Sequence, residues 1–437
     1  MEESKTEKAN AAEMLSFGGT QFAANIFMAF SSFYLMMFFT DVALIPPATT
    51  AVLLLFYRLF SAVDAQAIAL FINRKRFTDG KYRPYYKWCA LPFAVSLAAL
   101  GMTPYVSIGR VIYAAFILII CDLSWTTLQM ASFSMLPYLA RDDASRSEFV
   151  SFSNGSSILA YILVGTFMLP LTDFLGGGER SKGFALALTL LAIIAVPFLF
   201  NAYFRLKERF YSEPRIKPAI QHILLAIGRN RRIILFMAGF CIYSMADAFK
   251  NLTTYYYMIH IVGRPDLLPA IILAGLLSPL AMQPVIPRLL AYARKEGLIV
   301  FGLFTSSCSS LLMLAAGNRP FALIACIALY GMFTAIVSNM VFAVMASFSD
   351  EIRTRQNISM SEILAATMNL SSNIGIGIAS AASALGLAVW GYEAQTATQT
   401  AGALMGIKAL YILCTTAGMV FAGVLMLLFR KKTFVRL

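Results

Sequence analysis

The apolar run at Phe184–Leu199, FALALTLLAIIAVPFL, decides the fold class of this chain. Runs of about 17–25 residues like this one recur along the sequence, and each is long enough to cross ~30 Å of hydrocarbon as a helix. Lipid offers no partner to a free backbone amide, so a span is either a helix or a strand of a closed barrel. A barrel strand alternates in polarity, and this run does not. The sequence therefore predicts an all-α membrane protein.

The composition leads to the same prediction. Of the 437 residues, 59% are hydrophobic and only 13% are charged, whereas about 25% of a soluble domain is charged. The start, MEESKTEKANAAE, is acidic and polar, and a secretory signal needs a basic start followed at once by an apolar core. We therefore expect most of the chain to avoid water. We also expect the first span to stay part of the protein and not to be removed as a signal peptide.

Twelve spans are expected, with boundaries good to a few residues. They lie near 14–39, 48–72, 86–104, 110–136, 149–171, 183–204, 232–259, 268–287, 298–316, 320–346, 359–389 and 403–429.

The basic residues indicate which ends of the spans face the cytoplasm. About 27 of the 35 lysines and arginines lie in the two tails and in alternate loops, and about six lie in the opposite loops. Basic loops stay in the cytoplasm. We therefore expect both termini to be cytoplasmic, in a plasma membrane (the inner membrane if the source is a bacterium). The net charge of +13 then marks topology, and we expect no nucleic-acid partner.

The longest connection divides the chain near its middle, at 205–231. It contains two prolines and then apolar residues at helical spacing: Pro214, Pro218, Ile220, Ile223, Leu224 and Ile227. This pattern is typical of a short amphipathic helix on the cytoplasmic surface. The helix would link a six-helix half at 1–204 to a second at 232–437. That is the plan of the major facilitator fold, in which the solute site lies near mid-membrane between the halves.

Several segments, in order over nearly the whole chain, resemble those of one transporter family. They are Thr40–Asp41 in FYLMMFFTDVALI, Arg58, Asn73–Arg74 with Gly80–Lys81–Tyr82–Arg83–Pro84, Leu136–Pro137 with Arg141–Asp142 and Arg146, Tyr243, Asn251 and Tyr256–Tyr257 with Val262–Gly263, and Gly391–Tyr392. The sequence thus resembles the glycoside–pentoside–hexuronide cation symporters, the melibiose permease group of the major facilitator superfamily. The resemblance implies a sugar or glycoside substrate, alternating access, and coupling to Na⁺, Li⁺ or H⁺.

The positions that bind solute in that family differ here. Where the family has charged residues, this sequence has the amides Gln21, Gln129, Asn154 and Asn373, and Asn25 and Asn251 are further amides of the expected pocket. Amides both donate and accept hydrogen bonds. They predict a pocket for a polyol, or equally for an amide-bearing or zwitterionic solute, unless they only tie helices together.

The family's cation site also differs. Its two carboxylates in the second span align with Ser61 and Ala65, which leaves Asp64 nearby, and Thr126 aligns with a hydroxyl near that site. One carboxylate with hydroxyls makes a weak cage for a hard cation, which needs several oxygen ligands. A single carboxyl is enough to carry a proton, because a low-dielectric surrounding disfavours its charged form. We therefore expect no cofactor, and coupling to H⁺ through Asp64 or Asp122, with Na⁺ as the alternative.

Five ionisable residues lie inside predicted spans: Arg58, Asp64, Asp122, Asp247 and Lys250. A charge at mid-span costs at least ~2.5–3.5 kcal/mol, so each is a candidate functional residue. We assign the first three to the coupling site together with Ser61 and Thr126. Asp247 and Lys250, at i and i+3, either neutralise each other or clamp a head group of the solute.

Trp125 is the expected aromatic wall of the solute pocket. Asp122, Trp125 and Gln129 share one face of the fourth span. An indole offers an apolar face to a sugar ring and one N–H donor. The alternative for Trp125 is packing in the core.

Signatures of other classes are missing from the sequence. No G-x-x-x-x-G-K-[ST] or H-E-x-x-H occurs, and His222 and His260 are far apart. The cysteines show no metal-type spacing and are interpreted as small buried hydrophobes: Cys89, Cys121, Cys241, Cys308, Cys326 and Cys414. We expect no enzyme activity and no metal site.

The sequence thus predicts a secondary active transporter for a small polar solute, most simply a sugar or glycoside, acting as a monomer in membrane lipid. Two alternatives stay open. One is a carrier of lysolipids or other amphiphiles, with an apolar lateral slot beside Asp247 and Lys250. The other is a membrane sensor that binds solute without moving it. The lost carboxylates favour a sensor slightly, although no extra soluble domain is present to relay a signal.

Overall fold

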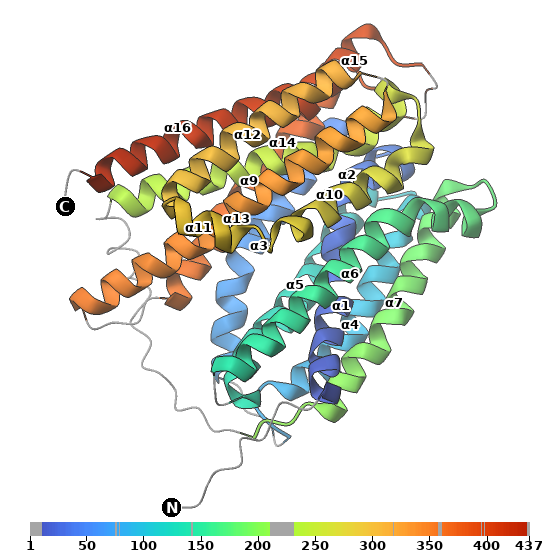
Figure 1. Cartoon of the computed structure of the whole chain (residues 1–437). Coiled ribbons are helices and arrows are strands. Elements are labelled where there is room, and N and C mark those ends of the chain that lie inside the picture. Colours follow the sequence, from blue (N-terminus) through green and yellow to red (C-terminus); the bar gives the residue numbers. More distant parts are fainter. Residues whose placement is uncertain are drawn as a thin grey trace, which may run out of the picture. The chain divides into compact units, whose positions relative to one another are not determined.

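The computed structural model describes residues 11–74, 77, 79–140, 143–209, 231–317, 319–356, 361–394, 396 and 398–434. Within these residues the chain is a series of long helices (Figure 1). The helices form two compact units. One consists of Met1–Ser31 with Val63–Arg215, and the other of Ser32–Ala62 with Ile216–Leu437.

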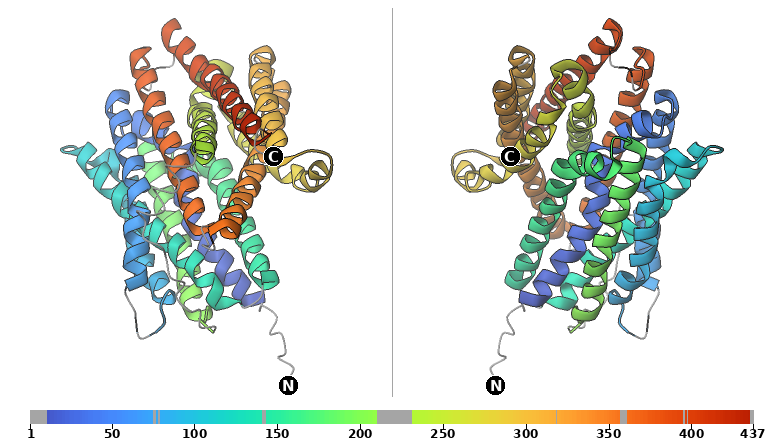
Figure 2. Two further views of the ribbon diagram at one scale, coloured as in Figure 1. Left: turned by 90° about the vertical axis from the view of Figure 1, so that its left-hand side faces the viewer. Right: turned by 90° about the vertical axis from the view of Figure 1, so that its right-hand side faces the viewer.

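The first unit is built mainly from five long helices. They are α1 (Ala11–Phe33), α4 (Arg83–Gly101), α5 (Arg110–Leu139), α6 (Asp143–Gly176) and α7 (Arg180–Arg205). The end of α3 (Pro47–Arg74) and the short η2 (Thr103–Tyr105) also belong to it. Helix α4 packs against both α5 and α7, and α6 packs against α7 (Figure 2). Fully buried Phe93, Leu118 and Leu188 fill this core.

The second unit contains the remaining elements. They are α2 (Leu35–Met37), η1 (Phe38–Val42), the first part of α3, α9 (Arg231–Tyr257), η3 (Met258–Val262), η4 (Pro265–Leu267), α10 (Leu268–Met282), α11 (Ile286–Tyr292), α12 (Lys295–Ala316), α13 (Pro320–Gln356), α14 (Ser361–Val389), α15 (Ala401–Lys408), η5 (Ala409–Cys414) and α16 (Thr415–Phe434). Helix α9 packs on α14 and α16, and α12 packs on α13 and α16 (Figure 1).

The predicted fold class is confirmed. In the described residues each of the twelve predicted spans is matched by one helix or by consecutive helical segments. Ten described helices are long and apolar enough to cross a membrane, and α1 with its continuation through α2 and η1 makes an eleventh. Helix α4 corresponds to the third predicted span. Its mean hydropathy is lower than that of the spanning helices because its first turns carry Arg83, Tyr85, Tyr86 and Lys87.

The division of the chain into two six-helix halves, 1–204 and 232–437, stays a prediction. Residues 32–62, from the first and second spans, pack with the second compact unit. The apolar positions of the expected linker helix, from Ile220 to Ile227, lie outside the described residues, as does His222.

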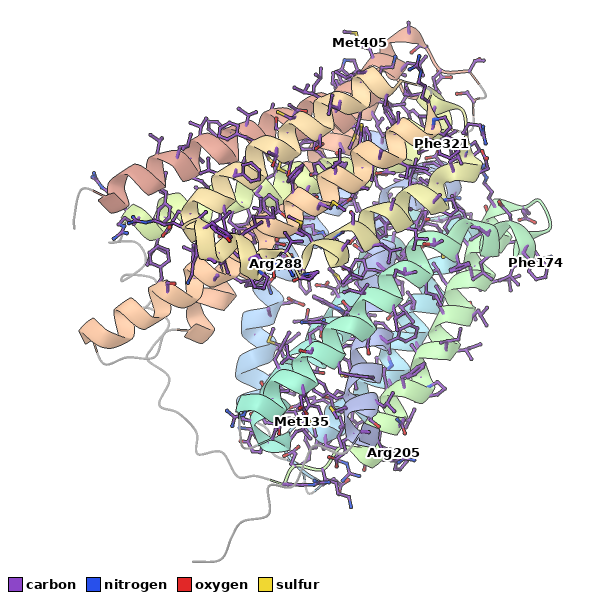
Figure 3. All side chains as sticks on the ribbon, viewed as in Figure 1. Met135, Phe174, Arg205, Arg288, Phe321 and Met405 are labelled. Carbon is purple, nitrogen blue, oxygen red and sulfur yellow. The ribbon has the colours of Figure 1, made fainter. Side chains whose placement is uncertain are left out.

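The outer faces of the helices are apolar. Phe174, Phe321 and Met405, which lie near helix ends, are 84%, 86% and 72% exposed and project outward (Figure 3). Cys308 is also exposed, on the outward face of α12 that includes Phe301 and Leu312, so its interpretation as a buried residue is wrong. Large exposed apolar surfaces are unfavourable in water, and they suit contact with lipid.

Glycine at position 375 allows the close contact between α14 and α9. A Cβ atom on Gly375 would collide with the Cys241 carbonyl oxygen and would lie 3.1 Å from the Met245 backbone nitrogen. Backbone atoms inside a helix cannot turn aside as a side chain can. We expect Gly375→Ala to destabilise the protein by about 2–3 kcal/mol, as overpacked cores do.

The measurement is thermal unfolding of the purified protein in detergent. Gly155→Ala is the matched control, because Gly155 is also inside a helix, α6, and a Cβ atom added there would meet nothing within 4 Å. That control should be neutral or slightly stabilising, since alanine favours a helix over glycine by up to ~1 kcal/mol. Equal unfolding temperatures for the two variants would contradict this account of the α9–α14 contact.

Candidate functional site

Two carboxyl groups meet in the core of the first unit. Asp64 of α3 is 4% exposed and Asp122 of α5 is 0% exposed. The Thr126 hydroxyl donates a 3.0 Å hydrogen bond to Asp64 Oδ2, and the Asp122 carboxyl lies close enough to that of Asp64 for direct interaction. Two ionised carboxylates repel each other strongly at such a place. A shared proton or a bound cation removes that repulsion.

This carboxyl pair changes one expectation. The alignment left a single carboxylate, Asp64, in the cation site, and treated Asp122 as an alternative proton carrier. The structure brings Asp122 to Asp64, so the site has two carboxylates with Thr126 beside them. Ser61 lies one turn before Asp64 on α3 and is also buried.

An open donor and an open acceptor lie one turn apart on α5. Trp125 Nε1 and Gln129 Oε1 are both buried, and neither has a hydrogen-bond partner among the described residues. Residues at i and i+4 share a helix face. A buried polar group without a partner costs free energy, so such atoms are well placed to bond a ligand that brings its own hydroxyl groups.

Two of the predicted amides bond each other in the same unit. Asn25 Nδ2 donates to the Gln21 backbone carbonyl at 2.8 Å, to Gln21 Oε1 at 3.5 Å and to the Ser157 hydroxyl of α6 at 3.1 Å. This contact ties α1 to α6. Asn154, one turn before Ser157, is exposed, and its role in a pocket stays a prediction.

A second polar cluster lies on α9 in the other unit. Asn251 Nδ2 donates to Asp247 Oδ2 at 2.9 Å, and the Tyr330 hydroxyl of α13 donates to Asp247 Oδ1 at 3.1 Å. Lys250 Nζ lies 4.6 Å from the centre of the Tyr330 ring. The hydrogen-bond partners of Asp247 here are an amide and a phenol, and both interpretations of Asp247 and Lys250, mutual neutralisation and a clamp for a solute head group, stay predictions.

Two further predicted residues, Asn373 and Arg58, have contacts on α14. Asn373 on α14 donates to Asn369 Oδ1, one turn earlier, at 3.2 Å. Arg58 is buried in the second unit, where its side chain lies against Gly377 of α14. Their assigned roles, and those of the other site residues, stay predictions.

One family-like motif forms a hydrogen-bond network in the second unit. The Tyr392 hydroxyl donates to Asp41 Oδ1 at 2.5 Å, and Thr40 Oγ1 lies 2.6 Å from Asp41 Oδ2 and 2.6 Å from the Tyr256 hydroxyl. His260 Nε2 is 3.4 Å from the Tyr392 hydroxyl. Thr40–Asp41 and Gly391–Tyr392 therefore serve to join segments that are far apart in the sequence.

A second motif has a structural role in the first unit. The Glu208 carboxylate accepts the backbone N–H groups of Lys81, Tyr82 and Arg83 at 2.9, 2.7 and 3.0 Å. These groups open helix α4, where a negative charge is favourable. Gly80 has a φ of +124°, a backbone conformation that favours glycine. The Gly80–Pro84 motif thus forms the anchor between the end of α7 and the start of α4.

Sequence reasoning missed Tyr330 and Ser157, which contact predicted residues from other helices. Tyr330 is a lone tyrosine inside the apolar run LIACIALYGMF. A buried phenol needs a hydrogen-bond partner, so its presence there was a signal. No such signal marked Ser157.

Comparison with known proteins identifies the family of this chain. The family model described as MFS/sugar transport protein matches residues 16–431. The chain belongs to the MFS/sugar transport family. The predicted resemblance is therefore confirmed, and the protein is a multi-pass membrane protein and a secondary transporter rather than an enzyme.

Individual relatives and a solved structure agree with this family. The isoprimeverose transporter of Lactiplantibacillus pentosus is 26% identical over 96% of this chain and 88% of its own length. An uncharacterized symporter of Bacillus subtilis, YnaJ, is 27% identical over 97% of this chain and 91% of its own. The crystal structure of the nucleoside transporter NupG matches with a TM-score of 0.70 at 11% identity, covering 96% and 99% of the two chains. That last likeness shows the fold alone.

Proposed function

We propose that this family member moves a small polyhydroxy solute, a sugar or glycoside, together with a proton by alternating access. The observation that carries the proposal is the buried pair of Asp64 and Asp122 with Thr126. The names of its relatives, an isoprimeverose transporter and a symporter, support both the solute class and the coupling.

The carboxyl pair favours H⁺ over Na⁺ as the coupling ion. Na⁺, a hard cation, needs several oxygen ligands, whereas a proton needs only one carboxyl group that can gain and lose it. In a dry site, two adjacent carboxyls bind one proton readily, because their repulsion is relieved when one becomes neutral. Na⁺ remains the second candidate for the same oxygens.

The solute side of the proposal rests on α5. The Trp125 indole face suits the C–H face of a sugar ring, and its Nε1 and Gln129 Oε1 can bond hydroxyl groups. The polar groups found around Lys250 suit a polyol better than an acyl chain. We therefore keep the sugar or glycoside as the solute and place the amphiphile carrier second.

The membrane arrangement is part of the proposal. We place both termini in the cytoplasm of a plasma membrane, because about 27 of the 35 basic residues lie on that side of the predicted topology. We also propose that the protein acts as a monomer.

The test uses purified protein in proteoliposomes. A panel of sugars and glycosides is screened by counterflow of labelled solute, and the external pH of a lightly buffered suspension is recorded as each active solute is added without Na⁺. We expect exchange, accompanied by alkalinisation outside. Binding without exchange would support the sensor, uptake that requires Na⁺ would replace the proton, and exchange of lysolipid alone would support the amphiphile carrier.

Trp125→Ala is expected to raise the solute concentration for half-maximal counterflow about tenfold. Loss of a ring contact and one N–H donor removes about 1–2 kcal/mol of binding, and 1.4 kcal/mol is a factor of ten. Trp88→Ala is the control, because Trp88 is 65% exposed on α4. An unchanged half-maximal concentration in Trp125→Ala would assign this tryptophan to core packing.

A further inference from the structure

Two cations lie together at the start of α4, against α7 of the same unit. The Arg83 guanidinium carbon and Lys87 Nζ are 4.8 and 5.3 Å from the centre of the Tyr203 ring of α7. Arg83 Nε also donates a hydrogen bond to the Tyr203 backbone carbonyl. Because an aromatic face attracts a cation, the ring of one tyrosine holds both positive side chains at one place.

This place is unfavourable for two cations on their own. Arg83 and Lys87 are at i and i+4, so they are neighbours on one helix face, where like charges repel each other. Arg83 is also the first residue of α4, and the N-terminus of a helix favours negative charge rather than positive. A cation pair kept at such a position points to an anion that binds beside it.

The carboxylates next to this pair are bonded to other groups. Glu208 accepts the backbone N–H groups that open α4, and Asp79 accepts the Tyr203 hydroxyl at 3.0 Å. In the part of the chain that the structure describes, neither carboxylate forms an ion pair with Arg83 or Lys87. The cation pair therefore keeps its positive charge for another partner.

Further positive charge lies at the same end of the unit. Arg205, the last residue of α7, is exposed, and so is Lys207 just after it (Figure 3). The Glu208 contact with the start of α4 brings this segment to the cation pair. The surface where α4 begins and α7 ends is thus rich in cations.

An apolar stripe of α4 begins directly beside the cations. Trp88, Leu91 and Val95, at i, i+3 and i+7, are all exposed and lie on one helix face. On the neighbouring helix, Phe204 is exposed as well. Tryptophan is enriched at the level of the lipid headgroups. The surface therefore changes from cationic to apolar within about one helical turn, as a phospholipid changes from headgroup to acyl chain.

We propose that Arg83 and Lys87 bind the phosphodiester of an anionic phospholipid, whose acyl chains lie along Trp88, Leu91 and Val95. The Lys87 ammonium has three N–H donors, and the Arg83 guanidinium has donors on its two terminal nitrogens besides Nε. Phosphate oxygens accept charge-assisted hydrogen bonds from both groups. A headgroup with a net negative charge, as in phosphatidylglycerol, suits this surplus of cations better than a zwitterionic headgroup.

The arrangement differs from that of a topology signal. Basic residues of cytoplasmic loops act through their number and their side of the membrane, so they need no fixed geometry. Arg83 and Lys87 lie instead within a helix and share the ring of Tyr203. A site built in this way should select its lipid, and this selectivity can be measured without transport.

The experiment is native mass spectrometry of the purified full chain after removal of lipid in detergent. The protein is titrated with phosphatidylglycerol and, separately, with phosphatidylcholine of the same acyl chains. We expect phosphatidylglycerol to bind at least about fivefold more tightly, since each cation near a lipid surface contributes about that factor. Inorganic phosphate should not displace it. Equal affinity for the two lipids, or displacement by phosphate, would overturn the proposal.

Variants of the cation pair test the site itself. Lys87→Gln should weaken phosphatidylglycerol binding about fivefold, and Lys87→Gln with Arg83→Gln about 25-fold, with little change for phosphatidylcholine. Lys87→Arg keeps the charge and should retain the affinity. Arg288→Gln is the matched control, because Arg288 is an exposed cation of α11 (Figure 3). An equal loss in Arg288→Gln would show unspecific attraction of lipid to basic residues and overturn the site.

A second measurement covers a failure of the double variant to fold. Lys87 is exposed, so Lys87→Gln alone is compared with the unmodified protein by thermal unfolding in detergent. A ligand that binds only the folded state raises the unfolding temperature. Phosphatidylglycerol should therefore raise that temperature more in the unmodified protein than in Lys87→Gln. An equal rise in both proteins would rule out Lys87 as a lipid ligand.

Discussion

Replacing both Asp64 and Asp122 by asparagine will abolish proton-driven accumulation of solute and leave exchange of solute intact. Asparagine keeps the size and the hydrogen-bonding oxygen of the carboxyl group but cannot gain and lose a proton. One pH unit is worth ~1.36 kcal/mol per proton, so a gradient of two units drives accumulation of about 100-fold in the unmodified protein. In the double variant we expect the solute only to equilibrate.

The measurement is the internal-to-external solute ratio in proteoliposomes after an imposed pH gradient, with counterflow on the same preparation. Each single variant keeps one carboxyl group that can carry a proton and should therefore accumulate more solute than the double variant. Asp173→Asn is the matched control, since Asp173 is exposed near the end of α6. Full accumulation by the double variant would rule out the pair as the proton site.

Asp41→Ala is expected to lower the free energy of unfolding by about 2–4 kcal/mol. The buried carboxylate accepts bonds from Tyr392 and Thr40, and Thr40 in turn contacts Tyr256. Removing the acceptor leaves these hydroxyl groups buried with fewer partners, and each bond to a charged acceptor contributes ~1.5–3 kcal/mol. Thermal unfolding in detergent should therefore begin several degrees lower.

Two controls test this prediction. Asp41→Asn keeps one acceptor oxygen and should lose less stability than Asp41→Ala. Asp266→Ala breaks an exposed ion pair with Arg264, whose atoms are 2.7 Å apart, and should change stability by less than about 1 kcal/mol. If Asp41→Ala is as mild as Asp266→Ala, the network does not hold η1 to the end of α14.

Long apolar runs in the sequence are enough to predict a helical membrane protein with many spans. Hydrocarbon allows only closed hydrogen-bond patterns, so a long apolar run has one solution whatever its neighbours are. The run at Phe184–Leu199 becomes part of α7 for that reason. The same reasoning selected the ionisable residues worth attention, because Asp64, Asp122, Asp247 and Lys250 could remain within spans only with partners or a function.

Which of these residues meet depends on how the helices pack in three dimensions. Periodicity places residues on a face of one helix, but it does not say how that helix is rotated or shifted against the next. Asp64 and Asp122 come together from α3 and α5, Tyr330 reaches Asp247 across 83 positions of sequence, and Tyr392 reaches Asp41 across 351. Those pairings depend on the packing of whole helices, in which many weak contacts from both partners set the register.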